Sequence, residues 1–248
     1  MLLPHQGLGD FIGLIGAVRH FASRLDRVTL AVERKRLANV QLLFGDLNNV
    51  ELFAFEATEA QLRQPLWRLP VISAACAGKD VRASGIHRQP PPTHVHCRHS
   101  KSLTDGFYCD LGLEPSVKQT CFKLPATQNA TRLLELLEQK PFCFAHQQAS
   151  TKAIRIQTSD LSMMIIDPCD NHYDATDARY ALAEQFIGHP IVDYQLLIQS
   201  AEEIRVIDSC FACMAFRLPI VAKKKIYYSR FPQPLGDLDA TWQFERAV

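Results

Sequence analysis

The chain has 248 residues, enough for one large or two small domains. With 47% hydrophobic and 21% charged residues, it has the composition of a globular protein that can bury a core. Its net charge of +1 gives no electrostatic reason to expect nucleic acid or an anionic membrane surface as a partner, and no apolar run reaches the length of a transmembrane segment.

The first residues lack a basic stretch followed by an apolar run, so we expect no signal peptide and a cytoplasmic location. The eight cysteines are spread over strand-like and helix-like segments. In that setting, reduced thiols are expected rather than a disulfide framework.

The first half of the chain alternates between strand-like and helix-like segments. The expected strands are 2–5, 27–32, 50–55 and 71–75. The expected helices are 10–24, 36–44 and 60–68. This order, with short loops, predicts a parallel sheet covered by helices on both faces.

Residues 77–100 interrupt this alternation of strands and helices, because glycines and the run Pro90-Pro91-Pro92 exclude regular structure. Residues 93–99 could still add a strand. A helix is then expected over 104–113, an extended segment over 117–124 and a helix over 131–139. Lys140-Pro141 stops that helix and suggests a hinge.

A second alternating series follows. Its expected strands are 142–146, 163–166, 203–207 and 225–228, and its expected helices are 177–186, 190–200 and 209–217. We therefore predict an α/β chain of two Rossmann-like domains, 1–139 and 140–248, with parallel sheets. The second domain is expected to be small, and its last helix could pack back on the first domain.

The first candidate site is the turn Gly7-Leu8-Gly9-Asp10 between the first strand and the first helix. Gly7 and Gly9 allow the backbone to approach a ligand closely, and a helix N-terminus presents free N–H groups there. Asp10 either caps those groups or points into a crevice as a base. The sequence leaves both roles open.

The second candidate site combines residues of the second half. His146 ends a predicted strand, where an α/β sheet opens onto a ligand crevice, and Asp208 and Ser209 stand at a helix start, where phosphate binds well. Lys152 and Arg155 lie in the turn after His146 and could neutralise phosphate charge.

Both turns carry a resemblance to one family. Gly7-Leu8-Gly9-Asp10 resembles the Gly-Asp turn of lipopolysaccharide heptosyltransferase-like glycosyltransferases (glycosyltransferase family 9). The stretch 200–209, which leads into a helix, resembles the Asp-Ser turn that these enzymes place near the donor diphosphate. The order of elements also fits their two-domain GT-B fold.

The resemblance implies an inverting glycosyltransferase that moves a sugar from a nucleotide-diphosphate donor to a hydroxyl of a glycan or glycolipid. It implies no metal and no cofactor besides the donor. Asp10 would be the general base. The donor would bind at His146, Lys152, Arg155, Asp208, Ser209 and Cys210, while Gly7, Gly9, His96 and His99 would line the acceptor side.

This sequence departs from the family in two ways. The family's Asp-Ser-Gly turn reads Asp208-Ser209-Cys210, which loses a glycine that permits close ligand approach, and the second half is short. Two alternatives therefore stay open. One is a GT-B-fold nucleotide-binding or scaffold protein without turnover, and the other is a nucleotide-sugar epimerase.

Two further clusters are explained by simpler structural roles. His94, His96, Cys97 and His99 are of metal-ligating types, but alternation along one strand divides them between two faces, so no zinc site is expected. Cys210 and Cys213 have the spacing of a redox motif at a helix start, where thiolates are favoured. Buried thiols in an apolar helix are the more common outcome.

Overall fold

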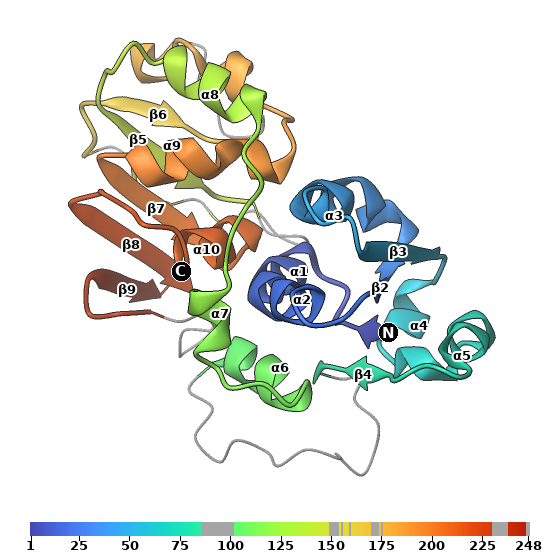
Figure 1. Cartoon of the computed structure of the whole chain (residues 1–248). Coiled ribbons are helices and arrows are strands. Elements are labelled where there is room, and N and C mark those ends of the chain that lie inside the picture. Colours follow the sequence, from blue (N-terminus) through green and yellow to red (C-terminus); the bar gives the residue numbers. More distant parts are fainter. Residues whose placement is uncertain are drawn as a thin grey trace. The chain divides into compact units, whose positions relative to one another are not determined.

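A computed structural model describes residues 1–85, 102–148, 154, 156–158, 160–169, 174, 176–229 and 238–246. The chain divides into two compact units, Met1–Pro125 and Ala126–Val248. Each unit contains one parallel sheet with helices connecting its strands (Figure 1). The predicted α/β class with two parallel sheets is confirmed.

The first unit has a four-stranded sheet in the order β3-β2-β1-β4. Its strands are β1 (Leu2–Leu3), β2 (Val28–Glu33), β3 (Val50–Phe55) and β4 (Arg82–Ala83). Its α-helices are α1 (Leu8–Gly13), α2 (Ile15–Ala22), α3 (Leu37–Phe44), α4 (Glu59–Leu62), α5 (Pro70–Cys76), α6 (Leu103–Asp110) and α7 (Val117–Thr120), and its 3-10 turns are η1 (Arg34–Arg36) and η2 (Leu66–Arg68).

The strand order of this sheet fixes where a ligand can bind. The chain steps outward from β1 to β2 and β3, and then returns to place β4 on the other side of β1. In parallel α/β sheets, such a reversal opens a crevice at the carboxyl ends of the two strands that flank it. The residues that follow β1 and β4 are therefore the ones to examine.

The buried Gln6 side chain holds the segment that follows β1. Its Nε2 donates to the carbonyl oxygens of Pro4 and Ala31, at 2.8 and 3.2 Å, and its Oε1 accepts from the Glu33 N–H at 2.8 Å. Pro4 has no N–H to continue the ladder. The Gln6 amide thus ties the turn to β2 where the backbone cannot.

The predicted helix over 10–24 is two helices, α1 and α2, because a tyrosine hydroxyl enters the backbone ladder. Tyr108 Oη accepts from the Ala17 N–H at 3.0 Å and donates to the Gly13 carbonyl at 3.1 Å. These are the two groups that an uninterrupted helix would pair with each other. A residue of α6 therefore produces the break.

Two predicted segments were wrong. Residues 71–75 are not a strand but part of α5, which begins at Pro70, a residue well suited to the first helical turn. Of these residues only Ile72 is buried, so a strand's two-sided burial is not available to them. Residues 117–124 are not fully extended, because α7 takes up Val117–Thr120.

The second unit has a five-stranded parallel sheet in the order β6-β5-β7-β8-β9. Its strands are β5 (Phe142–His146), β6 (Met164–Ile166), β7 (Glu203–Ile207), β8 (Lys224–Ser229) and β9 (Trp242–Arg246). Its α-helices are α8 (Gln128–Glu135), α9 (Gln195–Ser200) and α10 (Cys210–Ala215), and its 3-10 turns include η5 (Ala178–Tyr180), η6 (Ala183–Phe186) and η7 (Ile191–Tyr194).

In this sheet the reversal falls between β5 and β7, both of which are buried along their whole length. The order corresponds to the doubly wound arrangement in which a nucleotide cofactor lies at the ends of the first and third strands. His146 is the last residue of β5, and Asp208 follows β7.

The compact units divide the chain between Pro125 and Ala126, whereas the expected domains meet between residues 139 and 140. The difference comes from α8, which contacts η7 and α9 of the second unit. The last described element is the strand β9, paired with β8, so no returning terminal helix is present among the described residues.

Among the described residues, six cysteines are free, at positions 76, 121, 143, 169, 210 and 213. Cys109 is disulfide-bonded, which is an exception to the reduced thiols expected in place of a disulfide framework. In the described part of the chain, no helix has the length and hydrophobicity needed to cross a membrane.

Candidate functional site

The first candidate site lies where β1 and β4 end. α1 begins earlier than expected, at Leu8, with Gly7 as its N-cap, so Asp10 occupies the third helical position rather than the cap. Its carboxylate turns back, and Asp10 Oδ2 accepts from the Gly7 N–H at 3.1 Å. Asp10 therefore satisfies a backbone donor at the helix start.

Gly7 is required by this folded-back carboxylate. A Cβ atom at position 7 would lie 2.5 Å from Asp10 Oδ2, closer than non-bonded atoms approach. Gly7 thus makes room for the Asp10 side chain, which is a different role from the close ligand approach expected of it. Gly9 lies inside α1.

A histidine that the sequence analysis did not select completes this site. His5 Nδ1 lies 2.5 Å from Asp10 Oδ2, and the hydrogen bond to Asp10 raises the pKa of His5. The His5 ring is stacked on Phe107 of α6 with ring centroids 6.1 Å apart. Its position at the end of the expected strand 2–5 was the available signal, since residues at strand ends line the crevice.

The Asp10 carboxylate keeps one oxygen available. Both contacts described above use Oδ2. Among the described residues, none donates a hydrogen bond to Oδ1, and the Asp10 side chain is 21% exposed. A carboxylate held by one oxygen and open at the other has the geometry of a general base.

The second candidate site lies where β5 and β7 end, and it brings two predicted residues together. His146 Nδ1 lies 3.0 Å from Ser209 Oγ, and Ser209 Oγ also caps α10 by accepting from the Ala212 N–H at 3.4 Å. Asp208 accepts a hydrogen bond from the Tyr227 hydroxyl. The His146 ring lies 4.5 Å from the Phe211 ring, measured between centroids.

Cys210 does not act as a thiolate here. Burial raises the pKa of its thiol to about 12, so the proton is retained at neutral pH. The raised pKa of Cys210 gives no support to a redox role for Cys210 and Cys213, which the sequence analysis already considers the less common outcome.

Asp167, which follows β6, belongs to the same strand-end group and was missed in the sequence. Its Oδ1 accepts from the Cys169 N–H at 3.0 Å, and its Oδ2 accepts from Gln147 Nε2 at 3.2 Å. Burial raises the pKa of Asp167 to about 7. Its place directly after a correctly predicted strand was a signal that could have identified it.

Cys169 extends this group toward His146. Cys169 Sγ lies 3.7 Å from His146 Nε2, so the imidazole has a sulfur at one nitrogen and the Ser209 hydroxyl at the other. The strand ends of β5, β6 and β7 thus present His146, Cys169 and Ser209 as one connected polar group.

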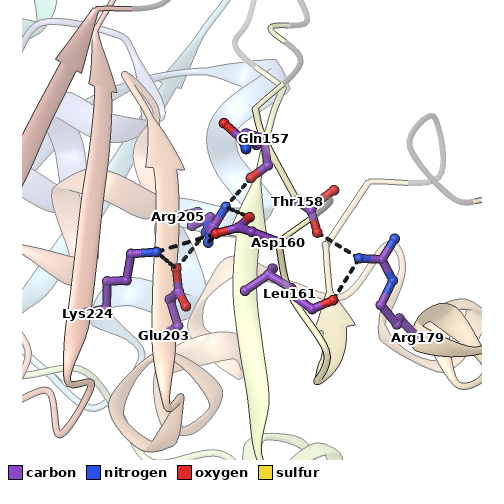
Figure 2. Close-up of polar contacts among 8 residues, drawn as sticks. All are labelled: Gln157, Thr158, Asp160, Leu161, Arg179, Glu203, Arg205 and Lys224. Carbon is purple, nitrogen blue, oxygen red and sulfur yellow. Dashed lines mark hydrogen bonds and ion pairs between the residues drawn. The ribbon is translucent and has the colours of Figure 1, made fainter.

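In the described part of the crossover between β5 and β6, arginine side chains hold residues 157–158 and 160–161 (Figure 2). Arg205, buried in β7, forms a bidentate pair with Asp160 at 2.6 and 2.8 Å and contacts Glu203 at 2.6 Å. Arg205 also donates to the Gln157 carbonyl, and Lys224 pairs with Glu203 at 3.1 Å. Arg205 lowers the pKa of Asp160 to about 2.

Arg179 supports the same crossover from η5. Its Nη1 donates to the carbonyl oxygens of Thr158 and Leu161, at 2.6 and 3.0 Å. Ile154, Ile156 and Leu161 then pack into the hydrophobic cluster on this face of the sheet. The arginine side chains thereby satisfy backbone carbonyl groups in the described part of the crossover.

Four predicted site residues, Lys152, Arg155, His96 and His99, lie outside the described residues. So do His94 and Cys97 of the same histidine-rich stretch. Within the described parts of the chain, no group of three or more histidine, cysteine or acidic side chains could hold a metal ion.

Together, these features define an α/β protein with two parallel sheets, each with polar side chains at its switch point. Comparison with solved structures shows that this is the GT-B fold, which the chain shares with heptosyltransferases. Heptosyltransferase II, the ADP-heptose lipopolysaccharide heptosyltransferase of E. coli, matches with a TM-score of 0.60 and 12% identity, over 100% of this chain and 90% of its own.

Two further structures agree. A glycosyltransferase of family 9 from Veillonella parvula matches with a TM-score of 0.60 and 9% identity, over 99% of this chain and 85% of its own. The E. coli heptosyltransferase WaaC with ADP-2-deoxy-2-fluoro heptose matches with a TM-score of 0.52 and 12% identity, over 100% of this chain and 92% of its own. No protein-family model and no curated protein matches the sequence.

Proposed function

We propose that this chain is a glycosyltransferase that moves a sugar from a nucleotide-diphosphate donor to a hydroxyl of a glycan or glycolipid, with inversion at the anomeric carbon. The observation that carries the proposal is Asp10, held by one oxygen at the switch point of a fold shared with heptosyltransferases. One structural neighbour is an ADP-heptose heptosyltransferase and another was solved with ADP-2-deoxy-2-fluoro heptose, so ADP-sugars are the first donors to test.

In this proposal the first unit binds the acceptor. The acceptor hydroxyl gives its proton to Asp10 Oδ1 as its oxygen bonds to the anomeric carbon. The bond from that carbon to the donor phosphate oxygen breaks, and the nucleoside diphosphate leaves with the electron pair. A single displacement of this kind inverts the configuration at carbon.

The second unit binds the donor. His146 and Ser209 stand where β5 and β7 end, the place at which this strand order binds nucleotides. A phosphate oxygen can accept from the Ser209 hydroxyl, and a protonated His146 would add a charge-assisted hydrogen bond. Lys152 and Arg155 follow β5 in sequence and are proposed to neutralise the diphosphate.

Thermal unfolding with candidate donors tests the donor site. ADP, UDP, GDP and their sugars are added one at a time, and a bound donor raises the melting temperature by mass action. At one hundred times the Kd, the gain in unfolding free energy is about 2.7 kcal/mol. If none of them shifts the melting temperature, the donor site is wrong.

Substitution of Asp10 tests turnover. Asp10→Asn keeps the size of the side chain and an acceptor oxygen, but it cannot take the proton. We expect sugar transfer to fall by about 100-fold or more while the donor still raises the melting temperature. An Asp10→Asn variant with full transfer activity would show that Asp10 only caps α1.

Metal independence needs its own test, because the sequence contains one Asp-x-Asp triplet, at residues 237–239. Paired carboxylates of this kind can hold a divalent cation beside a diphosphate. In the described structure, Asp239 accepts from the Thr241 N–H at 2.7 Å. We expect transfer to survive EDTA, and loss of activity that Mg²⁺ restores would contradict this part of the proposal.

A nucleotide-binding protein without turnover is the second candidate. One observation favours it: the two groups meant for the donor are already engaged, Ser209 with His146 and the α10 backbone, and Asp208 with Tyr227. This candidate predicts a donor-induced rise in melting temperature with no transfer by the unsubstituted protein.

A further inference from the structure

We propose that His5 is a positioning residue for Asp10, which fixes the carboxylate so that Oδ1 alone faces the acceptor. The inference rests on the proposed function, since it assigns a part in the same reaction. It starts from geometry: His5 Nδ1 is 2.5 Å from Asp10 Oδ2, the oxygen that also accepts from Gly7.

Two donors on one oxygen leave the Asp10 carboxylate little freedom. The Gly7 N–H holds it from the helix start, and the His5 N–H holds it from the segment after β1. Rotation that exchanged the two oxygens would break both hydrogen bonds. A base that is fixed in this way avoids the loss of rate that follows from misplacing a reacting group.

The His5 ring is itself held in place. It stacks on Phe107, with ring centroids 6.1 Å apart and planes 20° apart. Gly85, at the end of β4, lies against both rings: a Cβ there would be 2.9 Å from Phe107 Cε1 and 3.6 Å from His5 Cδ2. Gly85 has a φ of +63°, which further favours glycine.

Asp10 is the acidic side chain that pairs with His5, and the other acidic side chains near this site have partners of their own. Asp10 is the charged group that raises the His5 pKa, against the effect of burial. On α6, Asp110 accepts from the Gly85 N–H at 2.8 Å, and Asp105 pairs with Lys118 of α7. Glu33, at the end of β2, forms its ion pair with Lys35.

Two substitutions separate the hydrogen bond from the ring. His5→Phe keeps the stacking on Phe107 but removes the donor. His5→Asn removes the ring but places an amide N–H near the position of Nδ1. His20→Phe is the matched control, because His20 lies on α2 and contacts Arg24 and Phe21 rather than Asp10.

The kinetic test uses the nucleotide sugar that supports transfer in the donor panel. We expect His5→Phe to lower kcat by about 10- to 100-fold with little change in the KM for the donor. His5→Asn should recover most of kcat, and His20→Phe should match the unsubstituted protein.

A readout independent of turnover tests the pair itself. The His5 imidazole is titrated by NMR in the unsubstituted protein and in Asp10→Asn. The pKa of His5 should be above its ordinary value in the first and should fall in the second. An unchanged titration overturns the pairing.

The two proposals fail in different ways. If the unsubstituted protein transfers sugar and His5→Phe does so with the same kcat, the role of His5 is overturned and the proposed function stands. If the unsubstituted protein transfers no sugar from any donor of the panel, the proposed function fails, and the role of His5 fails with it.

Discussion

In the proposed function, the two roles that the sequence leaves open for Asp10 belong to different atoms of one side chain. Oδ2 accepts from the Gly7 N–H and stabilises the start of α1, while Oδ1 has no hydrogen-bond donor among the described residues. Capping therefore does not compete with chemistry. The cap holds the carboxylate whose other oxygen is proposed to act as a base.

Asp167 is expected to make stability depend on pH. Its pKa is about 7 in the folded protein, because of burial, against about 3.9 in an unfolded chain. The folded state holds this proton more tightly, so the contribution of Asp167 to stability is greatest below about pH 4. It declines as pH rises toward about 7, by an amount on the order of a few kcal/mol.

Urea unfolding of the Asp167→Asn variant between pH 4 and pH 8 checks this expectation. The decline in unfolding free energy over pH 4–7 should become shallower, since asparagine does not titrate. Asp160→Asn is the opposite control: the pKa of Asp160 is about 2, so its contribution to stability is present above pH 4 and is lost at lower pH. If the slope of Asp167→Asn equals that of the unsubstituted protein, the assignment is wrong.

At the scale of elements, the break between α1 and α2 depends on a close approach to α7. A Cβ on Gly16 would lie 2.6 Å from the Val117 carbonyl oxygen and 2.7 Å from Tyr108 Oη. Neither the carbonyl, which is backbone, nor the inserted hydroxyl can move easily. We expect Gly16→Ala to destabilise the first unit by about 1–3 kcal/mol in urea unfolding.

Gly106, within α6, provides the matched control. Nothing lies within 4 Å of a Cβ built on it. The same substitution, Gly106→Ala, should therefore stabilise the protein by about 0.5–1 kcal/mol, because alanine loses less backbone freedom on folding. Equal effects at the two positions would contradict the packing described here.

We expect removal of the buried Arg205 ion pairs to lower the free energy of unfolding much more than removal of an exposed ion pair. Arg205→Met leaves Asp160 without its bidentate partner and Glu203 buried with Lys224 alone. We expect a loss of about 3–5 kcal/mol in urea unfolding. Arg27→Ala, which removes an exposed pair with Glu51, should cost less than about 1 kcal/mol. Similar losses would show that burial of Arg205 is unimportant.

For the whole molecule, each compact unit has its own fully buried residues, among them Leu43 in the first and Leu197 in the second. Replacing either with alanine should cost about 2–5 kcal/mol. We expect amide hydrogen exchange to accelerate mainly in the unit that carries the substitution. Equal acceleration in both units would show that they unfold as one.

The sequence predicted the strands best, and for a physical reason. β2 and β5 are buried on both faces, so they appear as short, mainly apolar runs between turn residues. The helices were less predictable, because their ends depend on distant residues. Nothing between residues 10 and 24 indicates that Tyr108 divides α1 from α2.

Some residues of the candidate sites could be predicted from the sequence and others could not. Asp10, His146 and Ser209 stand beside recognisable turns, and the structure brings the last two together. The strand order has to be known before His5, Asp167 and Cys169 can be identified as site residues. It determines which residues lie at a switch point, and no local sequence pattern indicates it. Parallel pairing between distant segments decides which strand ends become neighbours.

The crossover held by Arg205 and Arg179 has a consequence for how such a chain can change in length. A helix that covers a sheet needs several turns in register with the strands beneath it. A segment held by hydrogen bonds to a few of its carbonyl and carboxylate groups needs only enough residues to span the distance between those bonds. Insertions and deletions between these hydrogen-bonded residues would then leave the strands of the sheet undisturbed. We therefore expect the number of residues in this crossover to vary most among relatives of this chain.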